Sequence, residues 1–160
     1  MADAVRFEVK GLREMAARMR ELGDKIERSI ADQALRAGAN VMRDDARQRA
    51  PVLAIPTKYR KPGVVKRAII TKKGRAPKGQ RMMRVGVRGL TKGAILKFKA
   101  AGGKAAQNPN DPFYWYFLER GTSKMAARPF LKPAFDAKNR EAVDVFSDTA
   151  TRRIEAEWRR

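Results

Sequence analysis

The chain has 160 residues, with 37 Lys plus Arg against 17 Asp plus Glu and a formal net charge of +20 at pH 7. It contains no cysteine and no histidine, so it forms no disulfide, is not expected to bind zinc or copper, and lacks the commonest general base and the best nucleophile. The length is typical of one domain. No apolar run of about eighteen residues and no signal peptide occur, so we expect a soluble chain outside the membrane. We also expect no cofactor.

The first fifty residues predict one strand followed by two helices. Residues 5–10 alternate apolar with charged side chains, which is the period of a strand. Apolar residues then recur at helical spacing over 12–22 and again over 24–50, where Asp24 is suited to cap the second helix. Gly38 lies inside that helix and costs about 1 kcal/mol there relative to alanine, so we expect another element to cross closely at this position.

The segment 51–111 is predicted to consist of loops and basic strands. It opens with a proline-rich loop over 51–66 and closes with a loop containing Gly and Pro over 101–111. Between the loops, three stretches carry β-branched or alternating apolar residues, and we expect them to form an antiparallel meander: 67–73, 81–89 and 94–100. In the last stretch, Leu96 and Phe98 are expected to face inward.

Positive charge is concentrated in this middle segment. No Asp or Glu occurs between Lys58 and Lys104, whereas both ends of the chain mix the two signs. Such a block is typical of a surface that meets a polyanion, most often nucleic acid. The predicted contacts with DNA or a partner are Lys72, Lys73, Arg75 and Lys78. Two alternatives stay open: a solubilising surface, and a basic loop that forms salt bridges with an acidic protein.

The stretch 111–134 holds six of the twelve aromatic side chains. Asp111 and Pro112 suit the start of a helix and Gly121 suits its end, so we expect a short helix over 112–120. This helix is apolar on most sides, and we predict that it is buried. Its two apolar faces carry Phe113, Tyr116 and Phe117 on one side, and Tyr114 and Leu118 on the other.

Glu119 is a single carboxylate within this aromatic stretch. A buried carboxylate requires a cationic or N–H partner, whereas an exposed one is an ordinary helix acid. Two interpretations stay open: exposure, and pairing with an Arg or Lys of the same chain or of a neighbouring subunit. Nothing nearby completes a nucleophile or acid/base set, so we predict no catalytic residue. Besides the two functions considered below, a third hypothesis is a nuclease that uses Glu119 and Asp111.

A long helix is predicted near the C-terminus, over 133–158, because apolar residues repeat there at helical spacing against charged ones. Together, the elements predict an α+β fold. An antiparallel sheet of about four strands is packed by two N-terminal helices and by the long C-terminal helix.

The run FLERGTSKMAARPFLKPAFD resembles the signature of the siphophage tail-completion, or neck, proteins. In that family an aromatic segment leads to a Glu-x-Gly-Thr turn, then to Pro-Phe-Leu-(Arg/Lys)-Pro-Ala and a last helix. The run LRAGANVMRDDARQRAP is similar to the family's N-terminal helix, while residues 52–112 depart from the pattern. The motif positions, which we take as candidate interaction residues, are Glu119, Gly121, Thr122, Pro129, Phe130, Leu131, Pro133 and Ala134; Lys132 occupies the Arg/Lys position between them.

The resemblance implies a single tail-completion or neck-like domain over 1–160, with its basic loop-and-strand region at 51–111. It implies a structural virion protein of a tailed phage or prophage, not an enzyme, assembled in the bacterial host cytoplasm. The protein would act at the head-proximal end of the tail or in the neck, completing the tail and joining it to the head. The expected partners are copies of itself in a ring, first of all a hexamer, and other tail and neck or connector proteins. Contact with DNA in the channel stays open, and the alternative function is a basic nucleic-acid-binding module.

Overall fold

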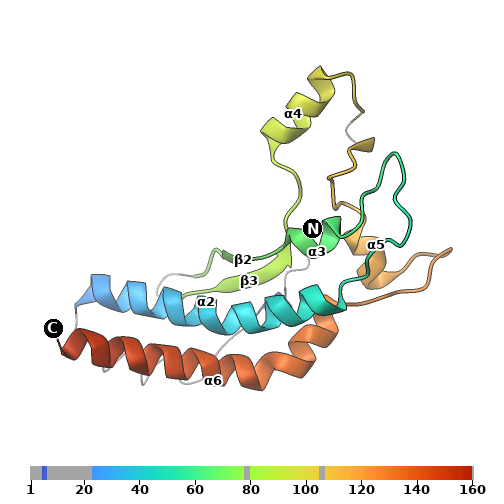
Figure 1. Cartoon of the computed structure of the whole chain (residues 1–160). Coiled ribbons are helices and arrows are strands. Elements are labelled where there is room, and N and C mark those ends of the chain that lie inside the picture. The colour runs from blue at the N-terminus through green and yellow to red at the C-terminus, as the bar shows by residue number, and fades with distance from the viewer. Residues whose placement is uncertain (1–4, 7–22, 78–79, 105–106, 160) are drawn as a thin grey trace.

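Two long helices dominate the computed structural model, which describes residues 5–6, 23–77, 80–104 and 107–159. Helices α2 (Asp24–Arg49) and α6 (Leu131–Trp158) run antiparallel, side by side (Figure 1). They confirm the helix expected over 24–50 and the C-terminal helix. Asp24 is the first helical residue rather than the cap, a position that Gly23 occupies. The helix predicted over 12–22 lies outside the described residues.

A small antiparallel sheet packs mainly on α2, with its strands in the order β1-β3-β2. The main ladder joins β2 (Ile69–Lys73) to β3 (Met83–Val87), and the two-residue β1 (Val5–Arg6) pairs with the other edge of β3. The expected strand over 67–73 is therefore confirmed in its last five residues, and the one over 81–89 in its central residues. The first of them is shorter because its start belongs to a short helix, α3 (Val64–Ala68).

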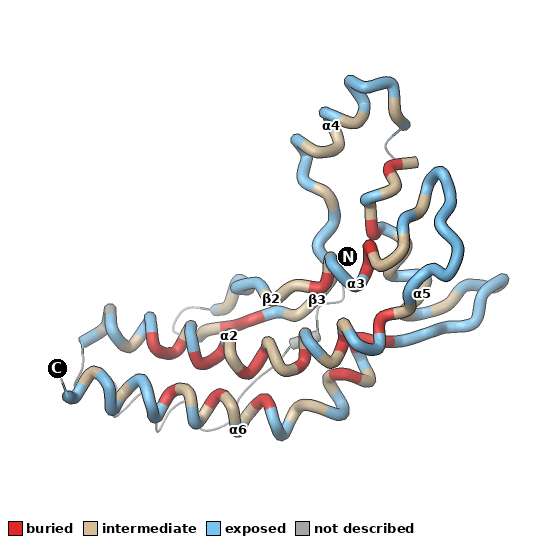
Figure 2. Tube along the Cα trace, in the orientation of Figure 1, coloured by how far each residue is buried: buried red, intermediate tan, exposed pale blue. Residues whose placement is uncertain are grey.

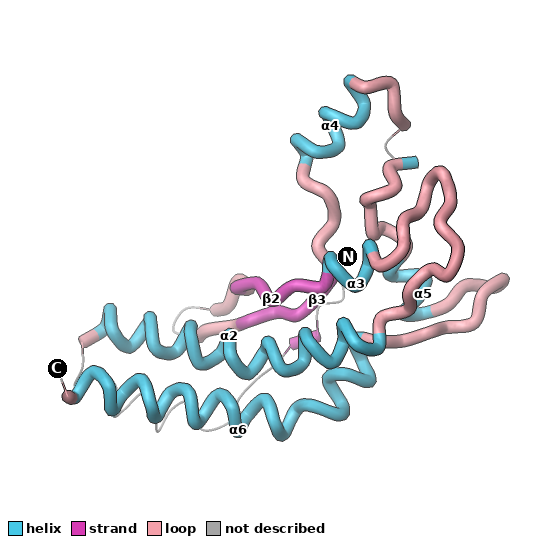
Figure 3. The backbone as a smooth tube through the Cα atoms, viewed as in Figure 1, coloured by secondary structure: helices cyan, strands magenta, loops and turns pink. Residues whose placement is uncertain are grey.

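The strand predicted over 94–100 is wrong, because these residues form helix α4 (Lys92–Ala100), as Figure 3 shows. Thr91 caps this helix by accepting a hydrogen bond from the N–H of Ala94 at 3.2 Å, and Gly102, at φ 82°, ends it. Ala, Leu and Lys, which make up most of α4, are good helix formers, so local propensity outweighs the alternating pattern. The described residues thus form three strands and not about four.

The hydrophobic core lies where α2, α6 and β3 meet, and it has two clusters. In the first, alanines of the two helices let them approach closely around Phe146 and Met83. The second joins the end of α2 and the start of β2 to the start of α6. Its fully or nearly fully buried members are Ala46, Ala50, Val65, Ile69, Phe130, Leu131 and Ala134.

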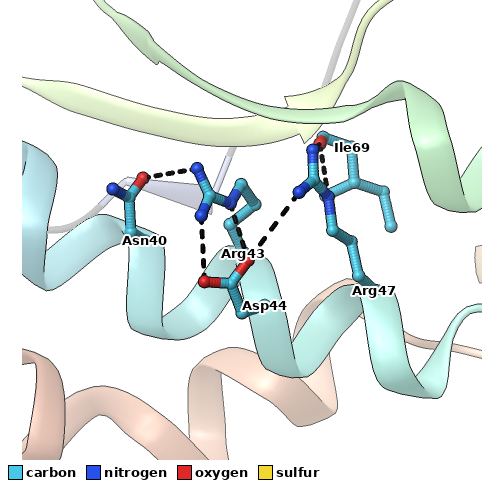
Figure 4. A network of polar contacts seen from close by, with 5 residues as sticks. All are labelled: Asn40, Arg43, Asp44, Arg47 and Ile69. Atoms are coloured by element: carbon cyan, nitrogen blue, oxygen red, sulfur yellow. Dashed lines mark hydrogen bonds and ion pairs between the residues drawn. The ribbon is translucent and has the colours of Figure 1, made fainter.

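Polar side chains connect α2 to the start of β2 (Figure 4). The Arg47 guanidinium donates two hydrogen bonds, of 3.0 and 2.7 Å, to the carbonyl oxygen of Ile69 at the start of β2. Its neighbour Arg43 holds Asp44 through two bonds of 2.8 and 2.9 Å and reaches Asn40 at 2.9 Å. The hydrogen bond from Arg43 keeps the pKa of Asp44 below its ordinary value, against a smaller opposite effect of burial. This network sets where the strand begins relative to the helix.

Gly38 of α2 sits where α6 crosses, as its position in the sequence predicted. A Cβ atom at Gly38 would lie 2.5 Å from the carbonyl oxygen of Ala142 on α6. No real Cβ contact is that short, so the two backbones can come together only around glycine.

We therefore expect Gly38→Ala to lower the free energy of unfolding. Overpacking typically costs about 1–3 kcal/mol, and a clash with a backbone oxygen belongs to the upper part of that range, about 2–3 kcal/mol; the gain in helix propensity offsets about 1 kcal/mol, so a net loss of roughly 1–2 kcal/mol is expected. The matched control is Gly93→Ala in α4, where a Cβ would meet nothing within 4 Å. Urea unfolding measures both variants. An alanine at position 38 that leaves the midpoint unchanged contradicts the close crossing.

Candidate interaction surfaces

The Glu119 carboxylate accepts three backbone hydrogen bonds from the first turn of α6. Glu119 lies on the short helix α5 (Trp115–Arg120). Its Oε2 accepts from the N–H groups of Phe130 at 2.8 Å and Leu131 at 3.1 Å, and its Oε1 accepts from Lys132 at 3.0 Å. The carboxylate therefore caps a helix whose first residue, Leu131, lies twelve residues further along the chain.

This cap replaces the one that α6 lacks locally. Phe130, the residue before α6, has no side chain able to accept a hydrogen bond, so the first N–H groups of the helix need a distant acceptor. A negative charge at this end is also favoured by the helix dipole. Of the two interpretations left open for Glu119, neither is confirmed. Among the described residues of its own chain, the half-buried carboxylate is satisfied by backbone N–H groups and not by an Arg or Lys.

The turn between α5 and α6 depends on Gly121, which ends α5 as expected. Its φ is 75°, and a Cβ there would lie 2.8 Å from the nitrogen of Ala127 and 2.9 Å from the carbonyl oxygen of Met125. Thr122 and Met125 exchange two backbone hydrogen bonds, of 2.8 and 3.2 Å. Only glycine can turn the chain here, because any side chain would collide with the backbone of Met125 and Ala127.

The other motif positions serve packing at the same junction. Phe130, Leu131 and Ala134 are buried in the second core cluster. Pro133 lies in the first turn of α6, where a missing N–H costs nothing, and Pro129 is exposed. The motif therefore builds the α5–α6 junction.

The aromatic helix α5 is amphipathic rather than buried, so the prediction of burial is wrong. Tyr114, Trp115 and Leu118 pack against the second core cluster. The face expected to carry Phe113, Tyr116 and Phe117 points instead to solvent, with exposed fractions of 42, 37 and 44%. We call these three residues the aromatic face. One side of the helix is enough to complete the core, and the other side stays partly exposed, with Arg60 lying over the Phe113 ring and Arg120 over the Tyr116 ring.

The helix is also shorter than the predicted 112–120. The bond from the N–H of Trp115 to the carbonyl oxygen of Pro112, at 2.8 Å, closes a turn before α5 begins. Asp111 accepts from the N–H of Phe113 at 3.1 Å, so it stabilises this turn and does not cap the helix. Burial raises the pKa of Tyr114, with Arg60 and Arg67 opposing it.

Two loops that Figure 2 shows as exposed adjoin α5 and extend the aromatic face into a larger apolar surface. Arg60, from the loop after α2, lies over the rings of Phe113 at 4.8 Å and Tyr114 at 5.4 Å. Between that loop, α5 and the turn after α5 lies an open groove of about 380 Å³. Its lining residues are Leu53, Arg60, Tyr114, Phe117, Leu118, Thr122 and Met125.

A second surface is the sheet face turned away from α2, which carries positive charge. Lys72 of β2 and Arg84 of β3 are directly opposite each other, and both are exposed. Like charges directly opposite destabilise a sheet unless an anion lies near them. We call Lys72 and Arg84, with the exposed Arg75 beyond β2, the basic face.

The four basic residues predicted as contacts do not form one group. Lys72 and Arg75 belong to the basic face, but the Lys73 ammonium lies 2.6 Å from Asp32 of α2, which also binds Arg81 at 2.9 Å. Burial raises the pKa of Asp32, but the hydrogen bonds from Lys73 and Arg81 outweigh it and hold the pKa below its ordinary value. Lys78 lies outside the described residues. The sequence prediction did not include Arg84, which the period of β3 could have placed beside Lys72.

Within the described part of the chain, no group of three or more acidic side chains is placed to hold a metal ion. Asp111 and Glu119, the pair considered for a nuclease, each accept backbone hydrogen bonds. Among the same residues, no helix combines the length and the apolar character that a membrane crossing requires.

Comparison with protein families gives one match. The family model described as "Bacteriophage HK97-gp10, putative tail-component" matches residues 13–121, more than half of the chain. The matched region contains α2, the sheet from β2 on, α4 and α5, and it includes the segment 52–112 that departs from the expected motif pattern. Comparisons with curated proteins and with solved structures find no match.

The cap makes Glu119→Gln a test of the junction. An amide keeps one acceptor oxygen but turns an NH₂ group toward N–H donors, so at least one charge-assisted bond is lost, at a cost of about 1.5–3 kcal/mol. The control is Glu141→Gln, an exposed acid of α6 that pairs with Lys138 and should leave stability close to that of the parent. Thermal unfolding of both variants is the measurement. Equal melting temperatures for parent and Glu119→Gln refute the structural role of the cap.

Proposed function

The chain belongs to the HK97-gp10-like family of bacteriophage tail components, and from this membership we propose that it acts at the head-proximal end of the tail or in the neck. There it completes the tail and joins it to the head. It works as a structural part of the virion, without turnover of a substrate. It forms one domain over 1–160 and is assembled in the host cytoplasm.

The observation that carries this proposal is the exposed aromatic face on a rigid support. Aromatic and arginine side chains are enriched in the centres of protein interfaces, and contiguous exposed apolar patches mark binding sites. Phe113, Tyr116 and Phe117 are held in place because α5 is tied to α6 through Glu119. A partner therefore meets a preformed surface, and little ordering entropy is lost there on binding.

The same end of the molecule carries the adaptable part of the surface. The loops at 52–61 and 122–129 are almost wholly exposed and extend from the helix–sheet body (Figure 2). Segments of this kind suit docking against other tail and neck or connector proteins, because they can adjust to a neighbour. We propose a closed ring of identical copies as the working form, with six copies as the first expectation.

The aromatic face gives the joining role a direct test. We expect Phe113→Ser with Phe117→Ser to reduce head–tail joining by about tenfold or more, because interface aromatics commonly contribute about 2 kcal/mol or more each. Because these side chains are 42 and 44% exposed, thermal unfolding of the double variant is measured beside joining, to separate a lost contact from a loss of stability. Trp158→Ser is the control, an aromatic residue that is 64% exposed at the far end of α6. The assay mixes purified heads with tails carrying each variant and counts joined particles. Normal joining by the double variant contradicts the role proposed for this surface.

A second candidate function, binding to nucleic acid, is favoured by the basic face. Lys72 and Arg84 face each other with no acid between Lys58 and Lys104 in the sequence to neutralise them. DNA passing through a tail or neck channel would supply phosphates to this face without any sequence preference. An acidic wall of a neighbouring protein would satisfy the same charges.

These two partners of the basic face can be separated by salt dependence. Lys72→Gln with Arg75→Gln and Arg84→Gln should flatten the dependence of duplex DNA binding on salt, by roughly 0.9 in the log–log slope for each phosphate that the variant no longer neutralises. Lys73 is kept because it pairs with Asp32. The control removes three exposed charges of α6 by Arg140→Gln, Arg152→Gln and Arg153→Gln. If the basic-face variant binds DNA like the parent but fails to join heads, the partner is an acidic protein. A variant that keeps both activities refutes both roles.

A further inference from the structure

Helix α4 stands away from the body of its own chain (Figure 1). It has nine residues, none of them buried. An isolated helix of this length is marginal in water, so it needs packing against something to be well populated. One side receives some cover from the loop that follows, because the ring of Phe98 lies against Gly103. The opposite side has none among the described residues.

The uncovered side of α4 carries Lys92, Leu96 and Lys99, spaced i, i+4 and i+7. All three are exposed, Leu96 to 64%. Residues at this spacing share one face of a helix. A leucine between two lysines is suited to an interface whose other side is acidic, since the apolar side chain is buried while the charges are paired. We call these three residues the α4 face.

An acidic surface that matches the α4 face occurs on α6 of the same chain. Glu141, Asp144, Asp148 and Glu155 are exposed and follow one another at i, i+3, i+7 and i+14, which places them on one stripe of the helix turned away from α2. Exposed Arg152 lies on the same stripe between Asp148 and Glu155 and donates to the carbonyl oxygen of Asp148 at 3.3 Å, so the uninterrupted acidic part runs from Glu141 to Asp148. Asp144, Asp148 and Glu155 form no ion pair with any described residue, whereas Glu141 binds Lys138 at 2.6 Å.

The two surfaces cannot meet within one molecule. α4 projects on the side of the sheet, whereas α6 lies beyond α2 on the other side of the body (Figure 1). Contact between them must therefore join two copies, each using a different surface. Such a head-to-tail contact closes into a ring when its rotation is that of a cyclic group.

We propose that α4 of one copy docks through Lys92, Leu96 and Lys99 on the acidic stripe of α6 of the next copy. The lengths of the two surfaces agree. From Lys92 to Lys99, and from Glu141 to Asp148, the chain advances seven residues, which is a rise of about 10 Å along a helix. The contact offsets part of the repulsion between copies that each carry a charge of +20. This inference rests on the ring in the proposed function and specifies which surfaces form it.

Crosslinking tests the contact, helped by a chain that contains no cysteine of its own. Leu96→Cys and Ala137→Cys are introduced together, the second at an exposed position one turn before Glu141 on the same stripe. The purified full chain at high concentration is treated with a bis-maleimide of about 10 Å, the rise of seven helical residues. A ladder of dimers, trimers and higher species on a denaturing gel is expected, and neither single variant should give it. Dimers from Leu96→Cys alone indicate a symmetric contact between two α4 helices and overturn the proposal, as does the absence of crosslinked species.

Charge reversal provides the specificity control. In the two-cysteine chain, Lys92→Glu with Lys99→Glu, or Asp144→Lys with Asp148→Lys, should each lower the ladder yield by about tenfold, through repulsion across the contact. All four changes together should restore it. A ladder insensitive to either reversal overturns the pairing. These outcomes are independent of the joining assay, because that assay can succeed when crosslinking fails, and crosslinking can succeed when the chain does not join heads to tails.

Discussion

The capping of α6 by Glu119 is the interaction on which the functional end of the molecule depends. Three N–H groups at the start of a long helix are satisfied by one carboxylate from a short helix that precedes it. Gly121 makes this geometry possible, because it lets the chain turn back at a distance that no other residue tolerates. Phe130 and Leu131 then enter the core beside the cap. One ionic hydrogen-bonded junction thus combines what the motif supplies: a turn, a helix start and a core anchor.

This junction divides the surface into parts with different physical character. Beside it, the aromatic face is partly exposed, and the neighbouring loops enlarge that apolar area. Away from it, the sheet presents Lys72 and Arg84, and α6 presents an acidic stripe. A structural protein that lies between different proteins of an assembly needs several such surfaces, because it contacts a different neighbour on each side. The basic face, the aromatic face and the α4 face are suited to different partners for this reason.

Sequence patterns predicted the long helices, two strands and the close crossing at Gly38, because each follows from a strong local period or an exception to one. They failed at residues 94–100, where alternation predicts a strand but helix propensity and the local cap at Thr91 select a helix. They also failed where tertiary context decides. Phe113 is apolar, yet the core is already complete without it. Glu119 was recognised as needing a partner, but a partner formed by the N–H groups of another helix cannot be found from charge alone.

The central claim is that this phage tail component is placed between head and tail with its aromatic face buried against a neighbour. Electron cryomicroscopy of the intact virion tests it most directly, because it locates the chain and shows what covers Phe113, Tyr116 and Phe117. We predict a ring of copies at the head-proximal end of the tail or in the neck, with those side chains enclosed by another protein. Copies located elsewhere in the particle, or an aromatic face still open to solvent in the assembled virion, would contradict it.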